Sequence, residues 1–281
     1  MKVYNNVCEL PANTSSVVAV GLFDGLHLGH HTVIERALAI AQEENLDTIV
    51  LTFDITEKSH PNAKRTDNRL LTPSLFESTL CNMGINAIVR LSFESICMLT
   101  DREFAQNILV HCLGAQAVCC GQNFRFGRGA TGNVDTLCRF GDEMGFSAEI
   151  LPLTYYNDSV ISATRIRACI EAGDLELAAN MLGRPYSIDF IANSITSAHH
   201  TSELPTIRQV FSSNYAKPPV GVYASAVYLS GVRFPAVSNI FVDNANMTIC
   251  ETHPKSSIAT ISNTHVKVEL LSYLHPLCSL D

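Results

Sequence analysis

The sequence of 281 residues has no apolar stretch near the roughly 18 residues that a membrane-spanning helix needs. Residues 1–16 lack the apolar core of a signal peptide. No long run of like charges is present, and the net charge of −8 disfavours non-specific nucleic-acid binding, which depends on clustered Lys and Arg. These absences predict a cytoplasmic protein that binds neither membranes nor nucleic acids.

The 10 cysteines form no Cys-x-x-Cys pair and no Cys/His cluster with the spacing of a zinc site. They are scattered along the chain, and only Cys119 and Cys120 are adjacent, inside an apolar run. Cysteine often packs as a small buried hydrophobic side chain. We therefore expect reduced, structural thiols rather than a disulfide scaffold.

Up to about residue 183, short apolar runs alternate with segments of helical period. Strands are expected at 17–20, 48–53, 87–91, 117–120 and 148–151, and helices at about 29–44, 73–84, 100–114 and after Asn133. Thr72 before Pro73, and the capping box of Thr100 and Glu103, mark two of the helix starts. This alternation predicts βαβ units and a doubly wound parallel sheet, closed by two short helices that end at Gly183.

After Pro185 the pattern changes to the two-residue period of half-buried strands, clearest at 222–228 and 265–270. Residues 193–218 are polar and show no clear period. We expect a small antiparallel β domain or barrel here. The predicted domains are 1–185 and 186–281.

The strongest motif is Gly-Leu-Phe-Asp-Gly-Leu-His-Leu-Gly-His at 21–30, which follows a strand and opens a helix. A helix N-terminus presents N–H groups and a partial positive charge, so it favours anions. His27 and His30, three residues apart, could both reach one phosphate group there. Ordinary loop histidines are the alternative, but the carboxyl end of a strand is where α/β sheets bind ligands.

Two further motifs fit a nucleotide site. Gly121 to Gly129 follows a predicted strand and contains Asn123, Phe124, Arg125 and Phe126; the aromatic pair suggests a pocket wall, although a solvated surface loop is the alternative. Ser162, Thr164 and Arg167 stand at the start of a helix. The hydroxyls could be simple caps, while Arg167 would share a helix face with Thr164 and could clamp a polyphosphate.

Together these motifs resemble the prokaryotic-type bifunctional riboflavin kinase/FAD synthetase family across residues 17–186. Five motifs of its adenylyltransferase module follow in order: residues 21–30, Thr52-Phe53-Asp54, residues 121–127, residues 162–167, and Leu182 to Tyr186. Where the family has a second serine in the clamp, this chain has Ala163.

The resemblance implies that ATP and FMN are the substrates and that AMP passes to FMN. His27, His30 and Arg167 would be the catalytic residues, and Phe124, Arg125 and Phe126 would be candidates for the flavin pocket. Asn123 would help to hold Mg²⁺ indirectly. The implied residues for ATP and its phosphates are Gly21, Phe23, Asp24, Gly29, Asn123, Ser162 and Thr164. The FMN phosphate attacks the α-phosphorus of ATP, so no protein nucleophile is required.

The C-terminal part resembles the family's riboflavin kinase module less well. Thr206, Asn239 and Glu251 match kinase positions, and Glu251 matches the catalytic base. However, Arg208 stands where an asparagine is expected, and Phe241 stands where a glycine is expected. We therefore expect a degenerate kinase domain.

Several alternatives remain open at this stage. The chain could rebuild a kinase site from other residues and be fully bifunctional, or it could bind flavins or nucleotides without catalysis. A different His-x-Gly-His nucleotidylyltransferase, such as one acting on pantetheine phosphate, also fits the first motif. The loop at 123–127 and the segment 182–186 disfavour that last possibility.

Overall fold

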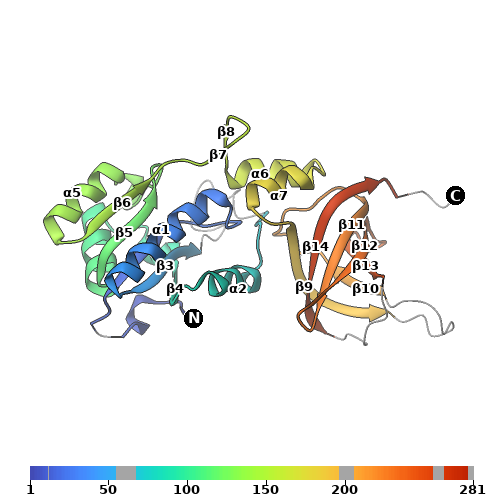
Figure 1. The fold of residues 1–281 in the computed structure, drawn as a ribbon, viewed down its shortest axis with the longest axis horizontal. Coiled ribbons are helices and arrows are strands. Elements are labelled where there is room, and N and C mark those ends of the chain that lie inside the picture. The colour runs from blue at the N-terminus through green and yellow to red at the C-terminus, as the bar shows by residue number, and fades with distance from the viewer. Residues whose placement is uncertain (12, 55–67, 196–205, 256–262, 278–281) are drawn as a thin grey trace. The chain divides into compact units, whose positions relative to one another are not determined.

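The computed structural model describes residues 1–11, 13–54, 68–195, 206–255 and 263–277 (Figure 1). The chain divides into two compact units, one of residues 1–66 with 76–161 and the other of residues 67–75 with 162–281. The division between units therefore falls before the two short helices, whereas the sequence places the domain boundary after them. Among the described residues, no helix combines the length and apolar character that crossing a membrane requires.

The first unit is built on a six-stranded parallel sheet with the order β1-β4-β3-β2-β5-β6. Its strands are β1 (Lys2–Tyr4), β2 (Ser16–Val20), β3 (Asp47–Asp54), β4 (Ala87–Ser92), β5 (Ala115–Gly121) and β6 (Ser147–Leu151). The helical segments are η1 (Val7–Glu9), α1 (Leu28–Glu44), α2 (Pro73–Met83), α3 (Phe93–Ile96), α4 (Asp101–Glu103), η3 (Phe104–Cys112), η4 (Arg128–Ala130) and α5 (Val134–Met144). The start of α2, up to Leu75, belongs to the second unit. The predicted doubly wound sheet is confirmed. The sequence does not predict strand β1, which pairs with β4 and forms one edge of the sheet.

The strand order reverses at β2. The chain runs from β2 outward to β3 and β4, and then crosses back to place β5 on the other side of β2. In open α/β sheets, ligands bind outside the carboxyl ends of the strands at such a reversal. The loops that follow β2 and β5 flank this point.

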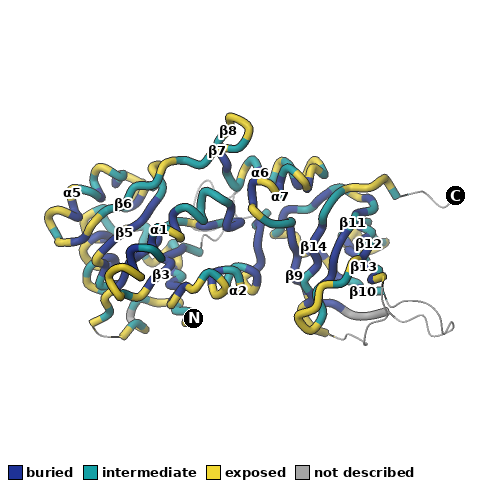
Figure 2. Tube along the Cα trace, viewed as in Figure 1, coloured by how far each residue is buried: buried dark blue, intermediate teal, exposed yellow. Residues whose placement is uncertain are grey.

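The apolar character and complete burial of β2 agree with its position inside the sheet. All five of its residues are buried (Figure 2). Its neighbour β5 carries Cys119 and Cys120, both fully buried. Burial raises the pKa of each thiol to about 12, so both stay protonated at neutral pH. This agrees with the structural role expected for them.

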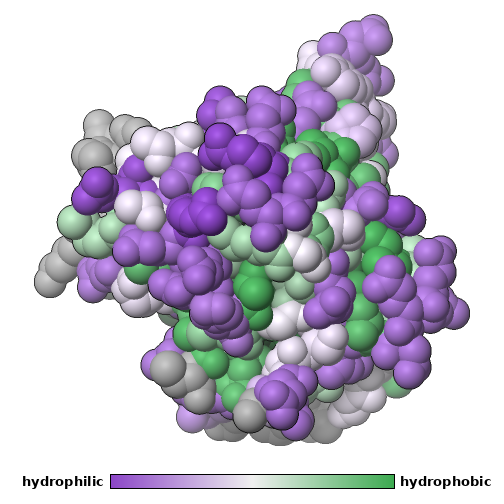
Figure 3. All heavy atoms as spheres, turned by 90° about the vertical axis from the view of Figure 1, so that its left-hand side faces the viewer, coloured by the Kyte–Doolittle hydropathy of each residue, from purple (hydrophilic) through white to green (hydrophobic). Residues whose placement is uncertain are grey.

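Three of the predicted helix starts are confirmed at atomic detail. The Thr72 hydroxyl accepts a hydrogen bond from the Leu75 N–H, the capping box of Thr100 and Glu103 is complete, and Asn133 caps α5. The helix that starts at Thr100 continues as the π-helix η3 rather than as a regular α-helix. The face of this unit seen in Figure 3 is largely hydrophilic, with apolar side chains between polar ones, as is normal for a solvated surface.

The second unit contains a closed antiparallel barrel with the order β10-β13-β12-β11-β14-β9. Its strands are β9 (Tyr186–Ile195), β10 (Thr206–Val210), β11 (Gly221–Leu229), β12 (Val232–Val242), β13 (Thr248–Pro254) and β14 (Thr264–His275). Two helices precede it, α6 (Ala163–Glu171) and α7 (Leu175–Leu182), and the latter ends at Gly183 as predicted. The expected antiparallel β domain is confirmed as a barrel. The hairpin of β7 (Tyr155–Tyr156) and β8 (Ser159–Val160) belongs to the first unit.

Strand β10 lies in the stretch that showed no period. Its two buried positions are Ile207 and Gln209, and Gln209 is 1% exposed and donates hydrogen bonds to the carbonyls of Phe190 (2.8 Å) and Val266 (2.7 Å). A polar residue at an interior position removes the alternation by which a strand is recognised.

Candidate active site

The loop after β2 has a backbone that most residues avoid. Phe23 (φ 51°) and Leu26 (φ 41°) have positive φ although both carry bulky side chains, and both are at most 1% exposed. Such conformations are costly and persist only where the surroundings enforce them, often at functional sites. The loop is also tied to the neighbouring strand β3, because the Thr52 hydroxyl donates to the Leu22 carbonyl at 3.1 Å. Thr52 belongs to the Thr-Phe-Asp motif, so the structure gives that motif a supporting role.

This loop delivers two imidazoles to the N-terminus of α1. His27 is the N-cap residue, and its ring stacks on that of His30 with centroids 3.5 Å apart and an angle of 17°. The ring of Phe23 meets His30 edge-on, with centroids 5.4 Å apart. The first turn of a helix directs backbone N–H groups outward from its end. Imidazoles and N–H donors thus gather where an anion is favoured.

Gly29 allows this close arrangement. A Cβ atom at position 29 would lie 3.3 Å from the His27 ring and 3.5 Å from the Thr154 hydroxyl oxygen. Thr154, which precedes the β7–β8 hairpin, also lies 3.5 Å from Thr32 on α1, measured between hydroxyl oxygens. Sequence reasoning missed Thr154, because nothing in the local sequence around it suggests a ligand. Two further motif residues of the same loop, Gly21 and Asp24, are partly exposed.

The second motif follows β5, on the other side of the strand reversal. Asn123 is exposed, and its Oδ1 lies 3.1 Å from the place of a Cβ on Gly121, so the amide folds back over the end of the strand. Phe124 is partly exposed and stacks on Phe126, with centroids 5.6 Å apart. Arg125 is exposed.

Phe126 does not face a pocket in the way that the sequence suggested. It is 5% exposed, belongs to the main hydrophobic core, and packs against Phe104 with centroids 5.6 Å apart. Phe104 in turn lies 6.3 Å from Phe53 at the end of β3, measured between ring centroids. The two aromatic side chains of the loop thus have different environments: Phe126 packs in the core, and Phe124 is partly exposed.

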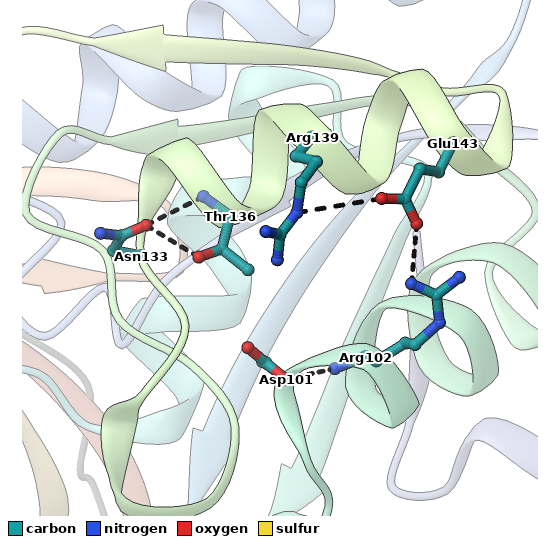
Figure 4. Close-up of polar contacts among 6 residues, drawn as sticks. All are labelled: Asp101, Arg102, Asn133, Thr136, Arg139 and Glu143. Atoms are coloured by element: carbon teal, nitrogen blue, oxygen red, sulfur yellow. Dashed lines mark hydrogen bonds and ion pairs between the residues drawn. The ribbon is translucent and has the colours of Figure 1, made fainter.

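The far side of this loop rests on the start of α4. The Arg128 N–H donates to the Leu99 carbonyl at 2.6 Å, and Gly127 (φ 75°) packs so closely on Asp101 that a Cβ would lie 2.6 Å from its backbone nitrogen. Asn133 then starts α5 by accepting hydrogen bonds from the N–H and hydroxyl of Thr136, both at 2.9 Å (Figure 4). The loop is therefore held at both ends.

An ion-pair cluster joins the two helices that hold the loop. Glu143 of α5 accepts from Arg102 at 2.7 Å and lies 3.9 Å from the Nε of Arg139 (Figure 4). Both guanidinium groups lie over the ring of Phe140, at 5.5 Å and 5.2 Å from its centroid. These arginines are thus engaged in structural contacts.

The third motif belongs to the second unit. Ser162 is the N-cap of α6, and its hydroxyl accepts from the Arg165 N–H at 3.3 Å, so the capping interpretation holds for that hydroxyl. Thr164 and Arg167, three residues apart, lie on one face of α6. The Nε of Arg167 donates to the carbonyl of Asn68 at 2.7 Å. Because His27 and His30 lie in the other unit, their grouping with Arg167 stays a prediction.

The three kinase-like residues share one face of the barrel. Asn239 and Glu251 are register partners on β12 and β13. His253 contacts both Thr206 and Asn239. Its Nδ1 lies 3.1 Å from the Thr206 hydroxyl, and its Nε2 lies 3.4 Å from the Asn239 amide nitrogen. The structure therefore brings Thr206, Asn239 and Glu251 together.

Arg208 fills the middle of this face. It is the register partner of Glu251, and its guanidinium lies 3.8 Å from the Glu251 carboxylate and 3.4 Å from that of Asp243. On this face, the Arg208 guanidinium thus lies between the carboxylates of Glu251 and Asp243. Across the described residues, no group of three or more His, Cys, Asp or Glu side chains is arranged to hold a metal ion.

Comparison with known proteins gives consistent results. The model of the FAD synthetase family matches residues 10–165, more than half of the chain. A bifunctional riboflavin kinase/FMN adenylyltransferase from Buchnera aphidicola subsp. Schizaphis graminum is 34% identical over 67% of this chain and 61% of its own length. The protein of the same name from Buchnera aphidicola subsp. Acyrthosiphon pisum is 32% identical over 84% of this chain and 75% of its own.

One solved structure has the same fold along nearly the whole chain. The crystal structure of a macrolide-efflux protein from Streptococcus pneumoniae superimposes with a TM-score of 0.84 at 24% identity, covering 99% of this chain and 92% of that one. At that identity the likeness concerns the fold alone.

Proposed function

The chain belongs to the FAD synthetase family, and on that premise we propose that it transfers AMP from ATP to FMN, forming FAD and releasing pyrophosphate. The observation that carries this proposal is the stacked pair His27 and His30 at the N-terminus of α1, beside the reversal in strand order. The reaction makes the enzyme a nucleotidyltransferase of FAD biosynthesis.

The chemistry requires positioning and charge stabilisation more than a reactive side chain. An oxygen of the FMN phosphate forms a bond to the α-phosphorus of ATP, and the bond from that phosphorus to the bridging oxygen breaks. Negative charge then develops on the departing pyrophosphate. His27, His30 and the first N–H groups of α1 would donate hydrogen bonds to it as this charge develops.

The other residues have proposed roles that follow from the resemblance. Gly21, Phe23, Asp24 and Gly29 would shape the ATP loop, and Ser162, Thr164 and Arg167 would form a second phosphate clamp. Phe124 and Arg125 would border the flavin, with Phe126 supporting Phe124 from the core. Asn123 would help to hold Mg²⁺, mainly through ATP phosphates and water. Bound there, Mg²⁺ would neutralise phosphate charge, and its preference for keeping water ligands fits a site with few protein ligands.

We further propose that residues 1–185 form the adenylyltransferase module and that residues 186–281 form a kinase-like domain with no riboflavin kinase activity. The ion pairs of Arg208 with Glu251 and Asp243 support this, because Glu251 faces a cation instead of a substrate hydroxyl. The grouping of Thr206, Asn239 and Glu251, together with the names of the relatives, favours the alternative of a fully bifunctional enzyme. Small-molecule nucleotides and flavins are the proposed partners, and the cytoplasm is the proposed location.

One assay tests these proposals. Purified protein is incubated with ATP, MgCl₂ and either FMN or riboflavin, and the flavins are separated while pyrophosphate is measured. We expect FAD and pyrophosphate in equal amounts from FMN. If folded protein leaves FMN unchanged under excess ATP, the chain is a non-catalytic binding protein or acts on another phosphate ester.

A further inference from the structure

The segment just before α2 connects the barrel to the arginine of the proposed phosphate clamp. The segment 68–75 belongs to the same compact unit as α6 and the barrel. Within it, Asn68 has φ 104°, a conformation that residues other than glycine rarely adopt. A residue held in such a conformation is a reason to ask what its geometry accomplishes.

Asn68 makes contacts in two directions. Towards α6, its carbonyl accepts from the Nε of Arg167 at 2.7 Å, and its side-chain amide donates to Glu171 at 3.0 Å. Towards the loop after β10, the N–H groups of Asn68 and Arg69 both donate to the Asn214 carbonyl, at 3.1 and 2.7 Å. The Arg69 carbonyl also accepts from the Ala216 N–H at 3.0 Å. These contacts enforce the unusual backbone.

From this geometry we infer that Asn68 is a positioning residue for Arg167. This inference rests on the proposed function, in which Arg167 binds phosphate. An arginine side chain has many rotamers, and a planar guanidinium recognises phosphate only when its fork points correctly. A hydrogen bond from Nε to a carbonyl holds one edge of the planar guanidinium. This sets the direction in which the two Nη groups point. The barrel loop thereby helps to orient Arg167 through the backbone of Asn68.

Glu171 is the second residue of α6 that Asn68 contacts. It lies four residues after Arg167 on α6, within reach of an ion pair with it. The Asn68 amide engages the Glu171 carboxylate instead. The side chain of Asn68 thus contacts Glu171 while its carbonyl contacts Arg167, and the carbonyl contact is the one that orients the guanidinium.

A matched pair of variants separates the carbonyl from the side chain. Asn68→Ala and Asn68→Gly both remove the amide, but only glycine tolerates φ 104° without strain, so only glycine keeps the carbonyl in place. We expect Asn68→Ala to lower kcat for FAD formation roughly 100-fold, the order expected for a misplacement of about 1 Å. Asn68→Gly and Glu171→Ala should stay within a few-fold of the unaltered protein. Thermal unfolding of each variant checks that it is folded.

A double-mutant cycle then tests whether Asn68 acts through Arg167. In an Arg167→Met background, Asn68→Ala should produce almost no further loss, because the group that it positions is gone. Equal kcat values for Asn68→Ala and Asn68→Gly, or full additivity with Arg167→Met, would overturn the inference. Wild-type kcat in Arg167→Met would instead overturn the phosphate role of that arginine, and failure of the unaltered protein to make FAD would overturn the proposed function. Should Asn68→Ala not fold, Asn68→Ser in the same cycle gives the corresponding comparison.

Discussion

In the first unit, His27 and His30 stand at a helix N-terminus that adds backbone donors to theirs, whereas in the barrel Glu251 stands opposite Arg208. The first arrangement concentrates donors around a point where an anion is favoured. In the second arrangement, the carboxylates of Glu251 and Asp243 both pair with the Arg208 guanidinium. His253 contacts both Thr206 and Asn239. Matching a catalytic motif therefore differs from being ready to bind a ligand: the groups at the start of α1 favour an anion, whereas the charged groups on the barrel face pair with one another.

The largest expected effect lies in the first region. His30→Ala should lower kcat for FAD formation by about 100- to 1000-fold, or about 2.7–4 kcal/mol, because it removes a donor to developing charge. His31→Ala is the matched control, since its imidazole points towards Glu35, 3.9 Å away on the same helix. Steady-state kinetics with FMN measures both variants. Equal losses for the two histidines would show that His30 has only a structural role.

The next effect concerns the barrel interior and changes stability rather than rate. Gln209→Leu should destabilise the protein by about 1–3 kcal/mol, because the carbonyls of Phe190 and Val266 lose a buried donor. Denaturant unfolding measures the change, with Val210→Ala at the neighbouring exposed position as control. If the variant is as stable as the unaltered protein, the amide does not hold the barrel together.

A smaller effect separates activity from stability in the first region. Gly29→Ala should push the His27 ring by a few tenths of an ångström and lower kcat about tenfold. Alanine favours helix more than glycine does, so the thermal midpoint should stay the same or rise. Parallel falls in kcat and midpoint would instead indicate general damage to α1.

The smallest effect is expected on the kinase-like face. Arg208→Ala removes two partly exposed ion pairs, which contribute about 0–1 kcal/mol. FAD formation should be unchanged, and riboflavin should still not be phosphorylated, because a base alone supplies only about 10²–10⁴-fold. Phosphorylation that appears on removal of Arg208 would mean that this arginine alone blocks a complete kinase site.

The sequence predicted the elements whose signals are local. The capping box at Thr100, the helix expected after Asn133 and the buried strand expected at 17–20 each depend on neighbouring residues, and all three are present. Strand β1 was missed because it has three residues, none of them buried, and pairs only with β4, which is distant in the sequence. Strand β10 was missed because polar Gln209 occupies one of its two interior positions.

The site was predictable as a set of motifs but not as a set of contacts. Nothing local indicates that Thr154 approaches Gly29 from beyond β6, or that the Asn68 carbonyl holds Arg167 from 99 residues away. Phe126 was expected beside the flavin, because an aromatic residue in a glycine-rich loop has the same pattern whether it faces a ligand or the core. Only its packing against Phe104 distinguishes the two.

The central claim is that the site at α1 reacts while the kinase-like face does not. It is tested most directly by giving the full-length protein, with ATP and MgCl₂, either FMN or riboflavin and following both flavin products over time. The expected result is FAD from FMN and no FMN or FAD from riboflavin, with Glu251→Gln indistinguishable from the unaltered protein in both reactions. Formation of FMN from riboflavin that is lost in Glu251→Gln would contradict it.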